Sequence, residues 1–178
     1  GNVLAFTPSS KPRHSALQAK CRGGSGNFPR LMIDLYYGSV INPTVRQQAA
    51  RYREQFDRAR PFRHLVMDYF FDVEPAKHLL ADFPAFHPDN ARNEFGEVGR
   101  KAVVTQIATV SPFYAEVYRL IASRDFLDFV SAITGIPELV HDEMMFGGGT
   151  HENLEGQELD PHVDFNFIED RKLHRRLN

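Results

Sequence analysis

The sequence has little of several residue types, and each shortage excludes a class of protein. Cys21 is the one cysteine among 178 residues, so the chain can form neither an internal disulfide nor a cysteine-based zinc site. We therefore expect a reducing, cytoplasmic environment. No run of 18 apolar residues is present, and the first residues lack the basic-then-apolar order of a signal peptide. We expect neither a membrane span nor a secretion signal.

Motifs of several common enzyme classes are also missing. The glycines of Gly147-Gly148-Gly149 are not followed by the Lys-Ser/Thr of a phosphate-binding loop, and they lack the later glycine of a dinucleotide site. No serine lies in the nucleophile-elbow pattern of the α/β-hydrolases. These absences leave histidines that lie near carboxylates as the remaining candidates for chemistry.

The charge that is present is unevenly distributed. The net charge is −2, but residues 1–63 carry a balance of +8 and residues 64–178 a balance of −10. A basic N-terminal segment can contact nucleic acid or an acidic partner, pack on the acidic body, or form a solvated arm. The basic residues are scattered, and no stacking aromatics interleave with them, so the sequence does not favour a nucleic-acid partner.

Hydrophobic spacing and capping residues predict helices first and strands later; the helix starts are marked by Asn42, Asp72, Ser111 and Ser123, and one helix end by Gly135. We expect a flexible basic leader over residues 1–30 and an extension over 31–60, with an amphipathic helix over 43–60. Further helices are expected over 72–83, from Pro112 and over 123–135, and strands over 62–71, 101–110, 138–146 and 159–167. This order predicts an α+β domain, with its helices packed on one face of a mainly antiparallel sheet.

Two His-x-Asp triplets occur, His87-Pro88-Asp89 and His162-Val163-Asp164, and His141-Asp142-Glu143 is a carboxylate-rich variant. On a strand, residues two apart point to the same face, so that an imidazole and a carboxylate can bind one metal ion. Pro88 makes a central strand improbable for the first triplet, and we interpret His87 as a turn residue. We interpret His141 as solvated or capping. The flanking apolar residues allow His162 and Asp164 to lie on a strand, with Val163 and Phe165 on its other face.

A longer pattern surrounds the triplet His162-Val163-Asp164. It resembles the iron-binding region of the 2-oxoglutarate- and Fe(II)-dependent dioxygenases, in the prolyl 4-hydroxylase-like branch. The resemblance also extends to the strand that begins that family's core and to the helix before its metal-binding strands. Its residues are Pro61–Phe70, Ser123–Gly135, Gly147–His151, Gly156–Asn166 and Leu173–Asn178.

The resemblance implies a double-stranded β-helix (jelly-roll) core, of which residues 61–178 form the N-terminal portion. It implies His162 and Asp164 as iron ligands, and Asn166 and Arg176 as residues at the same barrel mouth that bind cosubstrate or substrate or orient Asp164. Fe(II), 2-oxoglutarate and O2 are the implied cofactors, with ascorbate as a further candidate. The implied reaction couples decarboxylation of 2-oxoglutarate to succinate with hydroxylation of a C–H bond in a prolyl or other protein residue, or in a small metabolite. Phe146 replaces a tyrosine that hydrogen-bonds the cosubstrate in some relatives.

One element of the family pattern is missing from the printed chain. The third iron ligand of the family is a histidine several dozen residues after the aspartate, followed by an Arg or Lys for 2-oxoglutarate. His174 lies only ten positions after Asp164, and we interpret it as a turn residue. We therefore expect the natural protein to continue beyond Asn178. The alternatives are a binding module that has lost its iron site and a divalent-metal hydrolase that uses His162 and Asp164.

Overall fold

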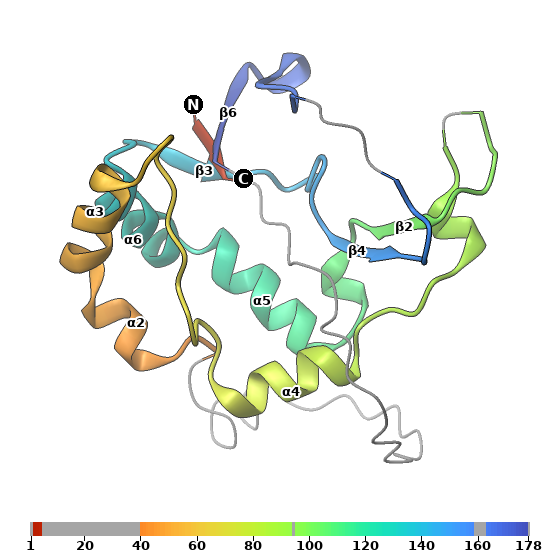
Figure 1. Ribbon diagram of the computed structural model, residues 1–178, viewed down its shortest axis with the longest axis horizontal. Helices are drawn as coiled ribbons and strands as arrows, with labels where there is room; N and C mark the ends of the chain where they lie inside the picture. Colours follow the sequence, from red (N-terminus) through yellow and green to blue (C-terminus); the bar gives the residue numbers. More distant parts are fainter. Residues whose placement is uncertain (1, 5–39, 94, 159–162, 178) are drawn as a thin grey trace.

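The computed structural model describes residues 2–4, 40–93, 95–158 and 163–177, and most of its helices precede its strands. The order is β1 (Asn2–Leu4), α2 (Pro43–Gln47), α3 (Ala49–Arg58), α4 (Val73–Ala81), β2 (Lys101–Val104), α5 (Pro112–Ala122), α6 (Arg124–Thr134), β3 (Leu139–His141), β4 (Thr150–Asn153), β5 (Phe167–Ile168) and β6 (Leu173–Leu177) (Figure 1). Short 3-10 turns lie at Pro88–Ala91, Ile107–Thr109 and Glu169–Arg171. The fold is α+β, as the sequence predicts.

Side chains cap the helices at the positions that the sequence indicates. Asn42 Oδ1 accepts a hydrogen bond from the Thr44 N–H at 3.0 Å at the start of α2, and Asp72 accepts from the Val73 N–H at the start of α4. Ser111 and Ser123 cap α5 and α6 through their hydroxyl oxygens. Such caps satisfy N–H groups that have no partner within the helix. The predicted helix over 43–60 is confirmed, with a break at Gln48 that divides it into α2 and α3.

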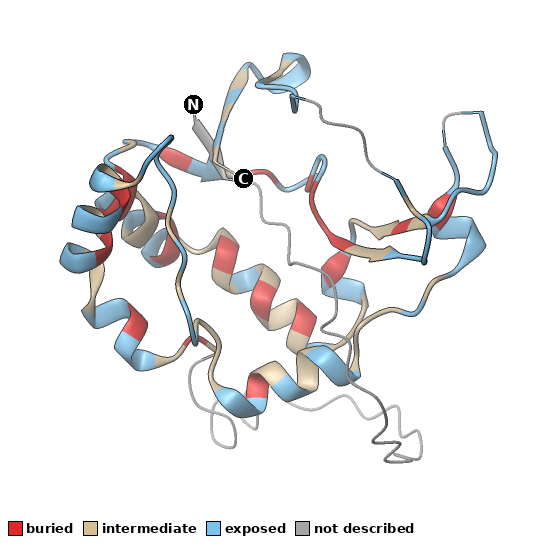
Figure 2. Ribbon diagram, in the orientation of Figure 1, coloured by how far each residue is buried: buried red, intermediate tan, exposed pale blue. Residues whose placement is uncertain are grey.

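The core lies between the helices and the turn that follows β3. Helix α3 packs against α6, and α5 packs against α4 and α6. Figure 2 shows the buried faces of α5 and α6 turned toward the interior. The buried residues of this core are Ile41, Val45, Tyr52, Phe56, Ile107, Tyr114, Val117, Ile121, Phe126, Ile133 and Met145. Since Met145 lies in the turn after β3, the core also anchors the segment that leads to β4.

The strands form two small sheets. The larger has the order β3-β1-β6-β5, in which β1 runs parallel to both neighbours and β5 runs antiparallel to β6. The smaller pairs β2 with β4 in antiparallel register, Lys101 opposite Asn153. Helices α5 and α6 pack against β3 at the edge of the larger sheet. The described residues form these two sheets and no double-stranded β-helix. Within the predicted leader, Asn2–Leu4 forms β1; residues 5–30 lie outside the described part of the chain.

The predicted strand over 62–71 is wrong. This segment is irregular, with a turn at Asp68 and Tyr69, where Tyr69 has a positive φ of 55°, and it pairs only at Phe71, in a single bridge to Ile41. Leu65, Met67 and Phe70 pack against the core, while Phe62 and Val66 are exposed. The apolar residues therefore reflect packing of an irregular segment on helices, which a strand-like pattern does not distinguish from pairing in a sheet.

Three further strand predictions hold only in part. The strand predicted over 101–110 ends at Val104, and the one over 138–146 is limited to β3. The one over 159–167 is reduced to Phe167 at the start of β5; residues 159–162 lie outside the described part, and 163–166 are not in a sheet. Val163 is 95% exposed, so it does not face a core as the alternation predicts. Strand β4 has no counterpart among the sequence predictions.

Glycine is required at position 149, where β4 begins. Gly149 has φ +114°, a conformation that side chains disfavour. A Cβ atom there would lie 2.4 Å from the carbonyl oxygen of Val104 at the end of β2. The glycine run thus lets the chain pass close to β2 and enter β4.

None of the helices in the described ranges is long and apolar enough to cross a membrane.

Candidate functional site

The turn from 142 to 149 is held in shape by a buried carboxylate. Asp142 follows β3, and its carboxylate oxygens accept hydrogen bonds from the Met144 N–H at 3.1 Å and the Phe146 N–H at 2.7 Å. Arg171 Nη1 lies 3.6 Å from the same carboxylate, and Arg171 Nη2 lies 3.6 Å from Glu143. Asp142 therefore determines where the turn places Phe146 and Gly147.

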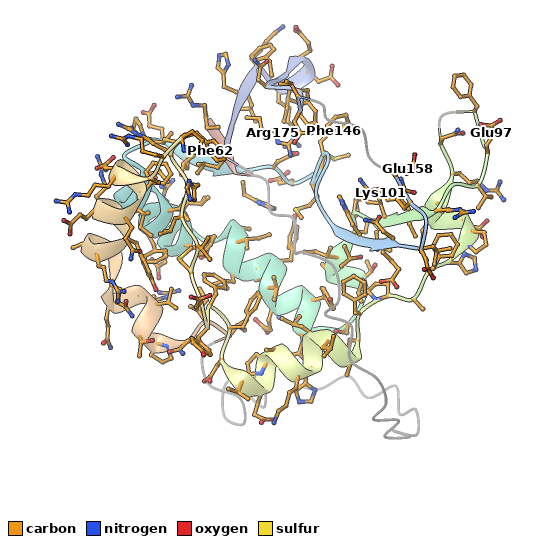
Figure 3. All side chains as sticks on the ribbon, in the orientation of Figure 1. Phe62, Glu97, Lys101, Phe146, Glu158 and Arg175 are labelled. Atoms are coloured by element: carbon orange, nitrogen blue, oxygen red, sulfur yellow. The ribbon has the colours of Figure 1, made fainter. Side chains whose placement is uncertain are left out.

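Two phenyl rings and a guanidinium meet beyond this turn. The rings of Phe146 and Phe165 pack edge to face with centroids 5.0 Å apart, and the Arg175 guanidinium carbon lies 4.5 Å from the centroid of Phe165. A Cβ at Gly147 would lie 3.3 Å from the Phe165 ring, so glycine leaves room for it. Figure 3 labels Arg175, which lies on β6, and Phe146, which lies in the turn between β3 and β4. Cation–π contact favours this placement of the guanidinium.

Asp164 joins the same group. Its Oδ2 lies 3.6 Å from Arg175 Nη2; the Arg175 side chain is 7% exposed and that of Asp164 41% exposed. The Arg175 N–H also donates to the carbonyl oxygen of Asn166 at 2.9 Å. Within the described residues, nothing accepts a hydrogen bond from the buried Arg175 Nε. We call Phe146, Asp164, Phe165 and Arg175 the aromatic–arginine cluster.

The structure brings together some of the predicted site residues. Asp164 lies in the aromatic–arginine cluster. The backbone carbonyl of Asn166 accepts a hydrogen bond from the backbone N–H of Arg175, and Asn166 is exposed. Along β6, exposure alternates, with residues 174 and 176 exposed and 173, 175 and 177 partly buried. Arg176 therefore points away from the face that Arg175 occupies. His162 lies outside the described residues.

The remaining histidines of the sequence analysis have structural surroundings of their own. His87 precedes the 3-10 turn at Pro88–Ala91 and accepts from the Asp89 N–H at 3.2 Å, in agreement with its interpretation as a turn residue. His174 lies on β6 rather than in a turn, and its ring contacts Phe167 with centroids 4.9 Å apart. His141 is partly buried rather than solvated, and its ring packs edge to face on Tyr118. No group of three His, Cys, Asp or Glu residues in the described ranges is arranged to hold a metal ion.

Comparison of the chain with models of protein families, with curated proteins and with solved structures finds no match. The dioxygenase resemblance therefore depends on the motif and on the local order of elements alone.

Sequence reasoning did not single out Arg175 or His151. Arg175 and Arg176 are adjacent and chemically identical, and only the pairing of β6 determines which of them faces Asp164. His151 lies on the strand β4 that the sequence did not predict, and within the described part its Nε2 is buried with no hydrogen-bond partner. The Gly147–His151 run was a signal for this region, but not for the role of any one side chain.

Burial disfavours the charged form of two histidines. It lowers the pKa of His151 below 6.5, with a further decrease from the charge of Lys101 and an opposing hydrogen bond to the Gly148 backbone. Burial also lowers the pKa of His141; Asp142 and Glu143 oppose this shift, and Arg171 adds to it. Both rings are therefore favoured in their neutral form in the folded state.

These shifts predict a pH dependence of stability. Below pH 6.5 the unfolded chain binds protons that the folded protein excludes, so the free energy of unfolding falls as the pH decreases. We expect the double variant His141→Gln/His151→Gln to lose less stability than the wild type between pH 7.5 and 5. Urea unfolding at several pH values measures this, with His174→Gln at an exposed position as control. Parallel curves for the wild type and the double variant would contradict the prediction.

Proposed function

We propose that the protein is a 2-oxoglutarate- and Fe(II)-dependent oxygenase of the prolyl 4-hydroxylase-like type, with His162 and Asp164 as iron ligands. The observation that supports this most is the placement of Asp164. The carboxylate of the motif is partly exposed, and on its inner side lies a nearly buried guanidinium that is itself stacked on an aromatic ring. A double-stranded β-helix is the fold that this proposal implies for the whole catalytic domain.

Asp164, the one proposed ligand within the described residues, fits a metal ligand set of this kind. Asp164 offers a carboxylate that solvent can reach, and imidazole together with carboxylate is the donor set that non-haem Fe(II) oxygenases use. Ligating carboxylates are in turn held by surrounding hydrogen-bonding and charged groups, and Arg175 is placed to do this. When bound, iron, 2-oxoglutarate and O2 would supply the oxidising chemistry, in which 2-oxoglutarate loses CO2, one oxygen atom of O2 enters succinate and the other enters the hydroxyl group of the product.

The chain's own residues contribute geometry and an apolar surface. The rings of Phe146 and Phe165 pack edge to face next to the motif, where Phe146 is 60% and Phe165 36% exposed. Phe146 has no hydroxyl group, so it cannot hydrogen-bond a cosubstrate, and its contribution is limited to apolar contact. His174 alternates with Arg175 on β6 and points to the opposite face, which makes it unsuitable as a third ligand beside Asp164.

Metal binding tests the proposal directly. We expect the full-length protein to bind Mn(II), an air-stable substitute for Fe(II), with micromolar affinity that increases when 2-oxoglutarate is present. Isothermal titration calorimetry measures both affinities. Binding that does not respond to 2-oxoglutarate would instead favour a divalent-metal hydrolase, and absence of binding would favour a non-catalytic module. Either result would overturn the oxygenase assignment.

A further inference from the structure

Arg175 is the most deeply buried charged group of the aromatic–arginine cluster. It lies on β6 with 7% of its side chain exposed, on the strand face that it shares with Leu173 and Leu177. Burial of a guanidinium is unfavourable unless the charge is paired and hydrogen-bonded. The groups that contact Arg175 among the described residues therefore indicate the role of its charge.

Those neighbours are three consecutive residues of one segment. The guanidinium lies 3.6 Å from the Asp164 carboxylate and 4.5 Å from the Phe165 ring, and the backbone N–H of Arg175 donates to the Asn166 carbonyl. Residues 163–166 are not assigned to a strand, and the bond from the Arg175 backbone N–H to Asn166 extends the β5–β6 pairing by one residue beyond Phe167 and His174. Asp164 and Phe165 precede this bond, and the Arg175 side chain contacts both of them.

We propose that Arg175 is a positioning residue, which fixes the carboxylate of Asp164 in the orientation required for metal binding. This inference rests on the proposed function, since it takes Asp164 as a metal ligand. The planar guanidinium can stack on Phe165 and at the same time direct an N–H toward Asp164, whereas an ammonium group cannot do both. Orientation of a ligand before the metal arrives reduces the entropy lost on binding.

Two opposing effects decide the outcome of removing Arg175. A positive charge beside Asp164 repels a metal ion, so removal of this charge alone would tighten binding. Loss of the restraint on the carboxylate would weaken it, and replacement of such outer partners typically costs about 10–100-fold in metal affinity. The proposal requires that loss of the restraint weakens metal binding by more than removal of the charge strengthens it.

The test compares Mn(II) affinities of full-length variants by calorimetry. We expect Arg175→Met to bind Mn(II) at least ~10-fold more weakly than the wild type. Arg175→Lys, which keeps the charge but not the stacking, should lie between the two. Arg119→Met is the control, because this exposed arginine lies on α5, pairs with Glu116 and is outside the aromatic–arginine cluster, and its affinity should match that of the wild type.

A double-mutant cycle separates positioning from a general structural role. In an Asp164→Asn background, where the amide oxygen remains as a weak ligand, Arg175→Met should cause no further loss of Mn(II) affinity, because the carboxylate that Arg175 positions is already absent. If Arg175→Met disturbs the fold, Phe165→Leu provides a second route: it removes the ring on which the guanidinium lies and should also weaken metal binding.

The outcomes distinguish this inference from the proposed function. If the wild type binds Mn(II) and Arg175→Met binds it equally well or more tightly, the positioning role is wrong and the oxygenase proposal stands. If the two losses in the cycle add, Arg175 acts on the fold in general and the inference is also wrong. If the wild type binds no Mn(II), both proposals fail.

Discussion

Replacement of His162 by alanine is expected to abolish the release of succinate from 2-oxoglutarate by the full-length protein. In the proposed site His162 and Asp164 are the two iron ligands that the printed chain supplies. Loss of the imidazole leaves a single carboxylate from this segment, which cannot hold Fe(II) in place at micromolar concentrations. Succinate can be quantified after incubation with Fe(II), 2-oxoglutarate and ascorbate, with and without candidate substrates such as prolyl peptides.

The chain offers a matched control for this experiment. His87 and Asp89 form the other His-x-Asp triplet, but His87 accepts a hydrogen bond from the Asp89 N–H at the start of a 3-10 turn. We expect His87→Ala to release succinate at the rate of the wild type. Normal turnover by His162→Ala would show that the motif at 162–164 is not the iron site and would overturn the assignment.

Short-range signals predicted the helices well. Asn42, Asp72, Ser111 and Ser123 each cap the helix that the sequence assigns to them, and Gly135 ends α6 with a positive φ of 71°. Caps and helix ends depend on residues within one turn, so a single sequence contains the information needed. The prediction of an α+β chain was correct for the same reason. The predicted order and sheet type were not fully correct, since β1 precedes every helix, β2 lies between α4 and α5, and β1 pairs in parallel with both neighbours.

Long-range pairing was much harder to predict. The apolar segment around Leu65 and Met67 packs on helices without joining a sheet, whereas the polar residues Thr150–Asn153 form β4 because β2 lies beside them. Strand formation depends on a distant partner, which local propensity does not reveal.

In the candidate site, too, the local motif was informative and the long-range strand pairing could not be predicted. The motif identified Asp164 from the sequence, and the structure placed it in the aromatic–arginine cluster. The sequence favoured Arg176, because it matched the resemblance, but the alternation of β6 brings Arg175 to Asp164 instead. A shift of one residue in register reverses which face each side chain occupies, so residue type alone could not decide between two adjacent arginines.

The second large effect is expected at Asp142, a buried carboxylate outside the proposed ligand set. Asp142→Ala would leave the N–H groups of Met144 and Phe146 without their acceptor and remove the partner of Arg171. A hydrogen bond to a charged group typically contributes about 1.5–3 kcal/mol, and water can partly replace the acceptor because Met144 and Phe146 are exposed. We therefore expect a loss of about 2–4 kcal/mol in the free energy of unfolding. For a domain of this size, this corresponds to a decrease in Tm of roughly 5–15 °C.

The neighbouring carboxylate is the control for that prediction. Glu143 also lies 3.6 Å from an Arg171 nitrogen, but its side chain is 75% exposed, and exposed ion pairs contribute little. We expect Glu143→Ala to change stability by less than about 0.5 kcal/mol. Urea unfolding of both variants measures the difference, and equal losses would show that the hydrogen bonds of Asp142 do not hold the turn.

If the prediction is correct, Asp142→Ala should also weaken Mn(II) binding. The turn that Asp142 holds positions Phe146 against Phe165, which is the neighbour of Asp164 in the chain.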